Sequence, residues 1–320
     1  MREVKGLISP AGESSDSLVV TCSSYEDRST AIVAKLSPRY CAGHAVVFRS
    51  SEYAQKGKTP AHFETITRKL QKVTLEDPRA VEFEIDSPIS SLRQFEGLCR
   101  EWNESSSLSD IAVDITTFPR QELLLLLRVL DSFPWRPRIR IFYAEPETYA
   151  TESTGGWLTR GVKSVSSVPG FGGIQEPGKK KLLVLFLGHE EERAAITWKR
   201  HQPNMTVTIL PNPSYRHELD GIAAKQQELF FTRLANTKPH PGVPALGIDQ
   251  SEEAVVDLWD KYHDTHYLVV APLGTKIQTL GIFRATRKKP SIQITYAVPS
   301  IYNFKSYSKS VGRVWEVAWS

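Results

Sequence analysis

The turn Pro272-Leu273-Gly274-Thr275-Lys276 combines residue types that suit an anionic ligand. An apolar segment typical of a buried strand precedes it, and a helix is expected to begin near Lys276. Glycine lets a ligand approach the backbone, the Thr275 hydroxyl can cap the helix, and the first N–H groups of a helix attract anions. The turn therefore predicts an anion-binding position at Gly274, Thr275 and Lys276. It lacks the spacing of a P-loop, and the alternative interpretation is a capped helix with a surface lysine.

Two further loops combine acidic residues with an arginine at the end of an apolar segment. They are Ser23-Ser24-Tyr25-Glu26-Asp27-Arg28 and Gly188-His189-Glu190-Glu191-Glu192-Arg193. Acidic residues in a first helical turn are favoured by the helix dipole, so the carboxylates can simply mark helix starts. The arginines can pair with them in a structural role or bind phosphate through two donors. Both interpretations stay open. The ligand-binding candidates here are Ser23, Ser24, Arg28, Gly188, His189 and Arg193.

Aromatic and hydroxyl side chains at other expected strand ends complete the set of binding candidates. Thr116 and Thr117 occupy the place in the first half that Gly274 and Thr275 occupy in the second. Tyr143 and Tyr296 end matching apolar segments and can stack on a base or lie in the core.

Two carboxylates are candidates for catalysis. Asp114 and Glu145 lie at strand ends, where a carboxylate can act as base or nucleophile in cleaving an N-glycosidic bond. Their counterparts, Ala271 and Val298, are uncharged. This asymmetry suits one catalytic and one supporting half, and drift would produce it equally.

An internal repeat indicates how these residues are positioned. Five segments recur in the same order: 18–32 with 182–196, 44–53 with 205–215, 81–88 with 245–252, 110–127 with 266–283, and 139–149 with 292–302. Short Val/Ile/Leu runs alternate with helical segments, which indicates parallel strands buried on both faces. The sequence predicts an α/β fold of two tandem Rossmann-like units, each a mostly parallel sheet with helices on both faces. The expected divisions are 1–150, a Gly/Ser/Pro-rich connector at 151–181, and 182–320, with the alternating C-terminal residues forming an edge strand.

Composition narrows the class of protein. The chain has 320 residues, a formal charge of +4 and 40% hydrophobic residues, which fits a globular protein and lacks the concentrated basic charge of a duplex-binding protein. Three cysteines without CxxC spacing favour a reducing compartment, and no apolar segment suits a signal peptide or a membrane span. The eight histidines show no HxxxH or HExxH spacing. We expect a cytoplasmic protein with no metal, cofactor or membrane partner, and duplex nucleic acid is not the expected ligand.

The Gly274-Thr275-Lys276 turn late in a Rossmann-like unit resembles the CARF and SAVED superfamily. The resemblance implies domains that sense cyclic oligonucleotides in CRISPR and related antiphage systems, with two such domains facing each other across a ligand. Those domains commonly carry a second glycine where this chain has Leu273. The first half has no glycine in the matching turn, which would suit an asymmetric ligand or a degenerated site.

Together these observations predict a sensor or regulatory subunit that binds a nucleotide-like anion in the cleft between its halves. Such a protein would need a partner to supply an effector activity. The anion is expected nearer the second half, because Asp114 and Glu145 would repel it. The alternatives are an enzyme that hydrolyses a nucleotide or nucleoside in that cleft, and a non-catalytic structural subunit.

Overall fold

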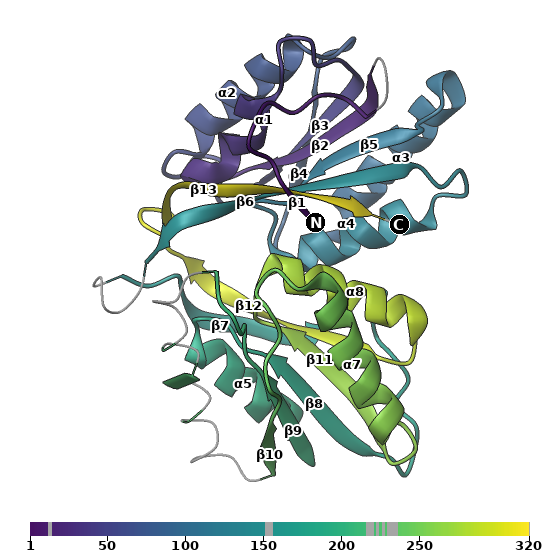
Figure 1. Cartoon of the computed structure of the whole chain (residues 1–320), viewed down its shortest axis with the longest axis vertical. Coiled ribbons are helices and arrows are strands. Elements are labelled where there is room, and N and C mark those ends of the chain that lie inside the picture. Colours follow the sequence, from purple (N-terminus) through teal and green to yellow (C-terminus); the bar gives the residue numbers. More distant parts are fainter. Residues whose placement is uncertain are drawn as a thin grey trace. The chain divides into compact units, whose positions relative to one another are not determined.

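The chain folds into two α/β units. The computed structural model describes residues 1–11, 15–150, 156–215, 221, 224, 225, 228 and 236–319, so residues 151–155 of the expected connector lie outside it. Unit 1 comprises residues 1–158 and 303–320, and unit 2 comprises 159–302. Figure 1 labels the elements of both units.

Unit 1 contains a seven-stranded sheet in the order β1-β13-β6-β5-β2-β3-β4. Strands β2 to β6 are parallel, and β13 joins β6 antiparallel. Its elements are β1 (Arg2–Glu3), β2 (Asp16–Ser23), η1 (Asp27–Thr30), α1 (Ala31–Lys35), β3 (Ala42–Ser50), α2 (Thr59–Gln71), β4 (Arg79–Phe83), α3 (Ile89–Ser106), β5 (Asp110–Asp114), α4 (Arg120–Ser132), β6 (Arg138–Tyr149) and β13 (Ser308–Trp319).

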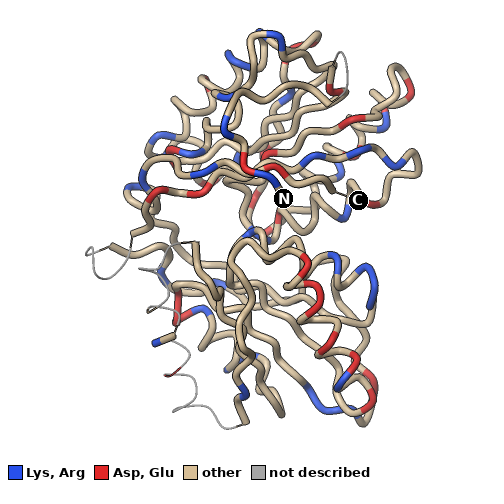
Figure 2. Tube along the Cα trace, viewed as in Figure 1, with Lys and Arg blue, Asp and Glu red and all other residues tan. Residues whose placement is uncertain are grey.

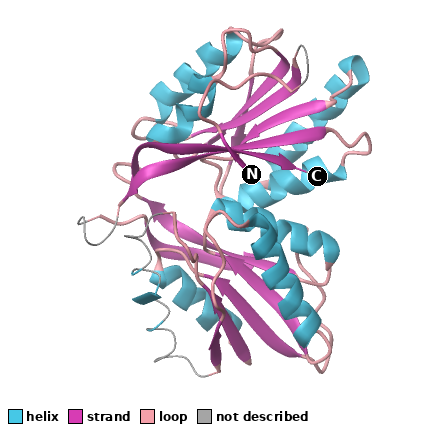
Figure 3. Cartoon of the chain, in the orientation of Figure 1, coloured by secondary structure: helices cyan, strands magenta, loops and turns pink. Residues whose placement is uncertain are grey.

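Alternating apolar residues of the strands place a core on each face of this sheet. Val19 and Val47 pack on the face covered by α1 and α2. Phe48 points the other way and contacts Phe95 of α3, with ring centroids 5.4 Å apart. In α4, residues 123–127 are all buried leucines. Figure 3 shows helices on both sides of the strands.

Unit 2 contains a six-stranded sheet in the order β10-β9-β8-β11-β12-β7. Five strands are parallel, and β7 joins β12 antiparallel. Its elements are β7 (Thr159–Ser167), β8 (Lys180–Phe186), α5 (Glu191–His201), β9 (Met205–Ile209), β10 (Thr237–Pro239), α7 (Ile248–Tyr262), β11 (His266–Pro272), α8 (Lys276–Lys288) and β12 (Gln293–Tyr302). Helix α5 packs on one face through Ala194, and α7 and α8 lie together on the other (Figure 1).

The two sheets have the same strand order, as the repeat predicts. When each sheet is read from the outer edge of its parallel strands, the two orders correspond. Unit 1 has the order β4-β3-β2-β5-β6-β13, and unit 2 has the order β10-β9-β8-β11-β12-β7. The repeat paired segment 81–88 with segment 245–252, but the second segment does not contain the strand that this pairing predicts. The strand of unit 2 that corresponds to β4 is the short β10, while Ala245 and Gly247 form a turn before α7. Proline at position 244 and glycine at 247 favour that turn over a strand.

The antiparallel strands β7 and β13 are each preceded along the chain by a strand of the other unit. β7 follows β6 along the chain yet pairs with β12, whereas β13 follows β12 and pairs with β6. The units therefore differ from the expected divisions: the connector contributes β7 to unit 2, and the C-terminal strand belongs to unit 1. β13 also has β1 on its outer side, so it is not the edge of its sheet.

Charge is distributed over both units. Figure 2 shows Lys and Arg spread along the described trace, with acidic residues following one another along α7. Among the described residues, no helix is both long enough and apolar enough to cross a bilayer.

Candidate functional site

In unit 2, the chain reverses its direction across the sheet between β8 and β11. The chain passes from β8 to β9 on one side, and β11 leads to β12 on the other. Ligands of open α/β sheets bind beyond the carboxyl ends of the strands at such a switch point. The two loops that flank it here are the predicted ones, Gly188-His189 after β8 and Gly274-Thr275 after β11.

These two loops pack backbone against backbone. A Cβ atom at position 188 would lie 2.2 Å from the carbonyl oxygen of Leu273. That distance is well inside van der Waals contact, so only glycine fits. Gly188 is thus required by the close approach of the loops, and it leaves the switch point without a side chain at this position.

We expect Gly188→Ala to destabilise unit 2, because the new methyl group must displace the backbone of the next loop. Overpacking of this kind costs about 1–3 kcal/mol. Thermal unfolding of the variant measures the effect. The matched control is Gly172→Ala, where a Cβ would meet no atom within 4 Å. Equal melting temperatures for the two variants would contradict the close approach.

The Gly274-Thr275-Lys276 turn begins α8 with a complete capping box. The Thr275 hydroxyl accepts a hydrogen bond from Gln278 N–H at 3.0 Å, and the Gln278 side chain accepts one from Thr275 N–H at 3.0 Å. Thr275 also donates to the carbonyl of Ala245 at 2.6 Å. The threonine is therefore a structural cap, as the sequence predicted for its hydroxyl.

The cation of this turn is the first residue of the helix. Lys276 occupies the first helical position of α8 and is half-buried, as is His189 in the facing loop. A lysine beside the first N–H groups of a helix adds a full charge to the partial positive charge of the helix end. Gly188, Gly274 and Lys276 thus lie at the same edge of unit 2.

The matching turn of unit 1 is built differently. Pro119 is the N-cap of α4, and Glu122 occupies the position that Gln278 has in α8. Proline has no N–H, so the capping box cannot close. Glu122 is 3% exposed, and neither carboxylate oxygen bonds another residue in the described part of the chain. Burial raises the pKa of Glu122 to about 8, and nearby Glu52 adds to the rise.

The predicted hydroxyl candidates of unit 1 are mostly engaged by its own backbone. Thr117 donates to the carbonyl of Cys22 at 2.5 Å, and Thr116 accepts from the N–H of Ala144 at 3.0 Å. The carbonyl of Ser24 is bonded to the ring of His62. Ser23 is buried, and its hydroxyl has no partner among the residues described.

Arg28 lies inside unit 1 rather than at its surface. It is 1% exposed, pairs with Glu26 at 2.8 Å and donates to the carbonyl of Ala144 at 3.1 Å. Tyr143, also 1% exposed, accepts a further bond from it at 3.3 Å. Burial opposes the charge, but Glu26 and the neighbouring tyrosines outweigh it and raise the pKa of Arg28.

Unit 2 repeats this arrangement. Arg193 is 3% exposed, donates to the carbonyl of Ala297 at 2.6 and 3.0 Å, and pairs with Glu190 at 3.1 Å. Its guanidinium lies 4.9 Å from the ring centroid of Tyr296, which is 2% exposed. The structure thus places both predicted arginines and both predicted tyrosines in buried networks, the structural role that the sequence left open.

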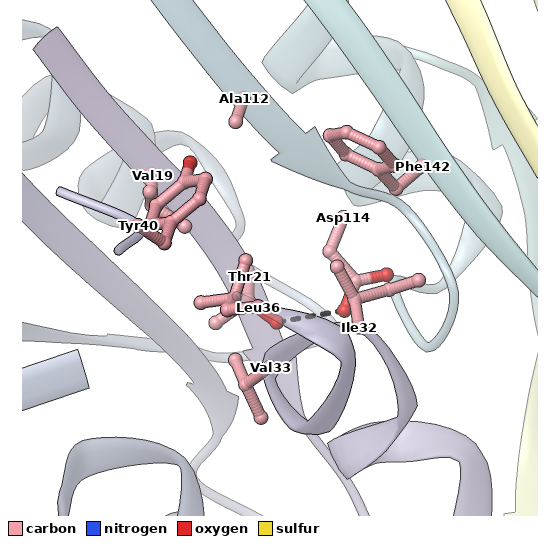
Figure 4. Close-up of a pocket in the computed structure, with 9 residues that line it drawn as sticks. All are labelled: Val19, Thr21, Ile32, Val33, Leu36, Tyr40, Ala112, Asp114 and Phe142. Carbon is pink, nitrogen blue, oxygen red and sulfur yellow. Dashed lines mark hydrogen bonds between the residues drawn. The ribbon is translucent and has the colours of Figure 1, made fainter. Parts of the chain in front are cut away.

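The two candidate catalytic carboxylates are also engaged within unit 1. Asp114 accepts from Thr21 at 3.0 Å and from Thr116 N–H at 2.9 Å, beside a cavity of about 10 Å³ (Figure 4). That volume corresponds to about one water. Glu145 is held by Arg313 and Trp315 of β13. Within the described residues, no group of three or more His, Cys, Asp or Glu could hold a metal.

Comparison with known proteins gives a fold but no family. No family model and no curated protein matches the chain. Among solved structures, a type III CRISPR defence DNA nuclease activated by cyclic oligoadenylate aligns over 88% of this chain, with a TM-score of 0.52 and 9% identity. The chain spans 65% of that structure. The cytoplasmic domain of a prokaryotic cation chloride cotransporter aligns with a TM-score of 0.28 and 10% identity over 91% of this chain and 98% of its own. At these identities, the chain shares with the CRISPR nuclease a fold, and the comparison shows no more than that.

Proposed function

We propose that this protein senses a nucleotide-like anionic ligand and regulates a defence activity. The anion-binding position is the carboxyl edge of unit 2, at the loops after β8 and β11. Cyclic oligoadenylates are the ligand class to test first, because the nuclease that shares the fold is activated by one.

The observation that carries this proposal is the construction of the switch point in unit 2. Two loops approach each other so closely that position 188 must be glycine. One of them ends in the capped first turn of α8, with Lys276 as its first residue. Backbone approach, helix N–H groups and a cation are the three features that bind phosphate groups in proteins.

The burial and the hydrogen bonds of the two candidate catalytic carboxylates favour a binding function over a catalytic one. Asp114 is bonded to Thr21 and to the Thr116 backbone, and Glu145 is bonded to Arg313 and Trp315. Each is at least 95% buried. A general base must reach the proton that it abstracts, and here both groups support the fold of unit 1.

A protein partner that carries the effector activity belongs to this proposal. Its support is the comparison with the CRISPR nuclease, a protein in which cyclic oligoadenylate activates a DNA nuclease. Co-purification of the chain with a nuclease or other effector, dependent on the ligand, would test the partner separately from the ligand.

We expect Lys276→Ala to abolish the ligand-induced rise in melting temperature and to leave the ligand-free melting temperature nearly unchanged. The loss of one phosphate contact removes a charge-assisted bond worth roughly 1.5–3 kcal/mol, or about 10- to 100-fold in affinity. Thermal shift and calorimetry with cyclic oligoadenylates, a linear oligoadenylate and ATP measure it. Lys199→Ala, an exposed lysine in the last turn of α5, is the matched control. Stabilisation of Lys276→Ala equal to that of the control would refute the site.

A further inference from the structure

Lysines and aromatic rings gather where the parallel strands of unit 2 begin. These strands start towards the bottom of Figure 1, at the opposite end of the sheet from the loops after β8 and β11. Lys180 begins β8, Lys238 lies in the short β10, and Lys261 and Tyr262 end α7. His266 begins β11 and is the register partner of Lys180. We call these five residues the amino-edge patch.

Tyr262 lies at the centre of the amino-edge patch. The ammonium groups of Lys261 and Lys238 lie 5.3 and 5.9 Å from the centroid of its ring, within the range of a cation–π contact. The ring of His266 meets the tyrosine edge-on, with the two centroids 5.7 Å apart. Both rings are half-buried, and Lys180, Lys238 and Lys261 are exposed. Aromatic surface and positive charge therefore lie side by side at this end of unit 2.

The three lysines of the patch have no carboxylate partner within the described residues. Asp260 and Asp264, beside them in the sequence, contact other basic residues. Asp257 lies one helical turn before the end of α7 and forms no ion pair with Lys261.

The electrostatics of His266 show how close these cations are. Burial lowers the pKa of His266, and the nearby Lys180 and Lys238 lower it further. Like charges are thus held together without compensation. Their mutual repulsion opposes folding, and a bound polyanion would relieve it.

Positive charge continues around the strand ends on the face that α5 covers. Lys181 follows Lys180, and its ammonium group lies 6.0 Å from the ring centroid of Tyr267 and donates to the carbonyl of His201 at 2.6 Å. Burial lowers the pKa of His201 to about 4, with smaller contributions from Lys181 and Arg200. A polyanion that crosses the end of the sheet would therefore meet cations on both of its faces.

We propose that the amino-edge patch binds single-stranded nucleic acid. The lysines contact phosphate groups, and the rings of Tyr262 and His266 stack on bases, a combination that binds single strands without sequence preference. An acidic peptide would satisfy the lysines and leave the rings unused, and a duplex keeps its bases stacked inside the helix. Because the patch lies at the other end of the strands from Lys276, this inference is independent of the proposed anion position.

Fluorescence anisotropy of the full chain with a labelled oligouridylate or oligothymidylate of about 20 nucleotides tests the charge contribution. We expect Lys180→Gln with Lys238→Gln to weaken binding of each strand about 10-fold or more at low salt. The plot of log affinity against log salt should flatten by about 1.4, because each phosphate contact on a single strand contributes about 0.7. The matched control, Lys72→Gln with Lys305→Gln, removes two exposed lysines of unit 1 and should keep the wild-type affinity and slope.

Tyr262→Leu separates stacking from charge, because leucine keeps the apolar bulk and lacks the aromatic face. Affinity for both strands should fall by about fivefold or more, with the salt dependence unchanged. A labelled oligoglutamate should bind the wild type more weakly than either strand and should not respond to Tyr262→Leu.

Three results would overturn the proposal. The first is no binding of either strand by the wild type, and the second is an equal loss in the lysine double variant and its control. The third is oligoglutamate binding as tight as that of the strands, together with no effect of Tyr262→Leu. The patch would then recognise acidic protein segments instead.

Discussion

Replacing Glu122 with glutamine is expected to raise the free energy of unfolding of unit 1 by about 3 kcal/mol at pH 7. The carboxyl is buried, bonds no other described residue, and has a pKa of about 8 against an ordinary value of 4.5. At pH 7 the folded chain keeps this carboxyl protonated, whereas the unfolded chain releases the proton. This difference lowers the free energy of unfolding. An amide of the same shape has no such cost, and Gln278 shows that it fits the equivalent position of α8.

The pH dependence follows from the direction of the shift. Below about pH 4.5 the carboxyl is neutral in both states and costs nothing. Between there and about pH 8 the unfolded chain releases a proton that the folded chain keeps, so stability falls as the pH rises. Above that range both states are ionised and the full cost persists. The advantage of Glu122→Gln should therefore grow from about pH 5 to about pH 8 and then level off.

Urea unfolding of the wild type and the variant across this range measures the difference. Glu104→Gln, on the exposed side of α3, controls for the loss of one negative charge and should show no such pH-dependent gain. A constant difference between wild type and Glu122→Gln at every pH would show that Glu122 ionises normally in the folded protein.

Much of this fold could be predicted from the sequence because its signals are local. Buried strands alternate with helices along the chain, and matching segments recur in order, which was enough to predict two units with one strand order. The pairing of β7 with β12 and of β13 with β6 could not be predicted, because strand pairing depends on contacts between residues far apart in sequence. The short β10 has too few residues for a periodic signal.

The candidate site, like the fold, could be predicted only in part from the sequence. Gly188 and the Gly274-Thr275 turn were identified, since glycine and threonine have local reasons to occur before a helix. The arginines and tyrosines were identified as special, but their burial could not be read from residue type. Glu122 was missed. Its signal was available in the sequence: a glutamate three residues after Pro119, where a capping box would need the N–H that proline lacks.

Removing the Arg28 guanidinium should destabilise unit 1 strongly. Arg28→Met leaves Glu26 buried, bonded to the Ser308 hydroxyl and without the charge of Arg28 beside it. Breaking a buried ion pair in this way costs about 3–5 kcal/mol, because one charge remains without compensation. The exposed pair Arg68–Glu64 on α2 provides the matched control, since Arg68→Met should change stability by no more than about 0.5 kcal/mol.

The double variant Arg28→Met with Glu26→Gln separates the lost charge from the lost packing. Removing the second charge relieves the uncompensated burial, so the double variant should be more stable than the sum of the single effects predicts, by about 1–3 kcal/mol. Unfolding free energies of the four proteins give this coupling directly. Additive effects would mean that water reaches Glu26 when Arg28 is gone. The ion pair would then contribute little to the buried network that holds the first-strand loop against β6 and β13.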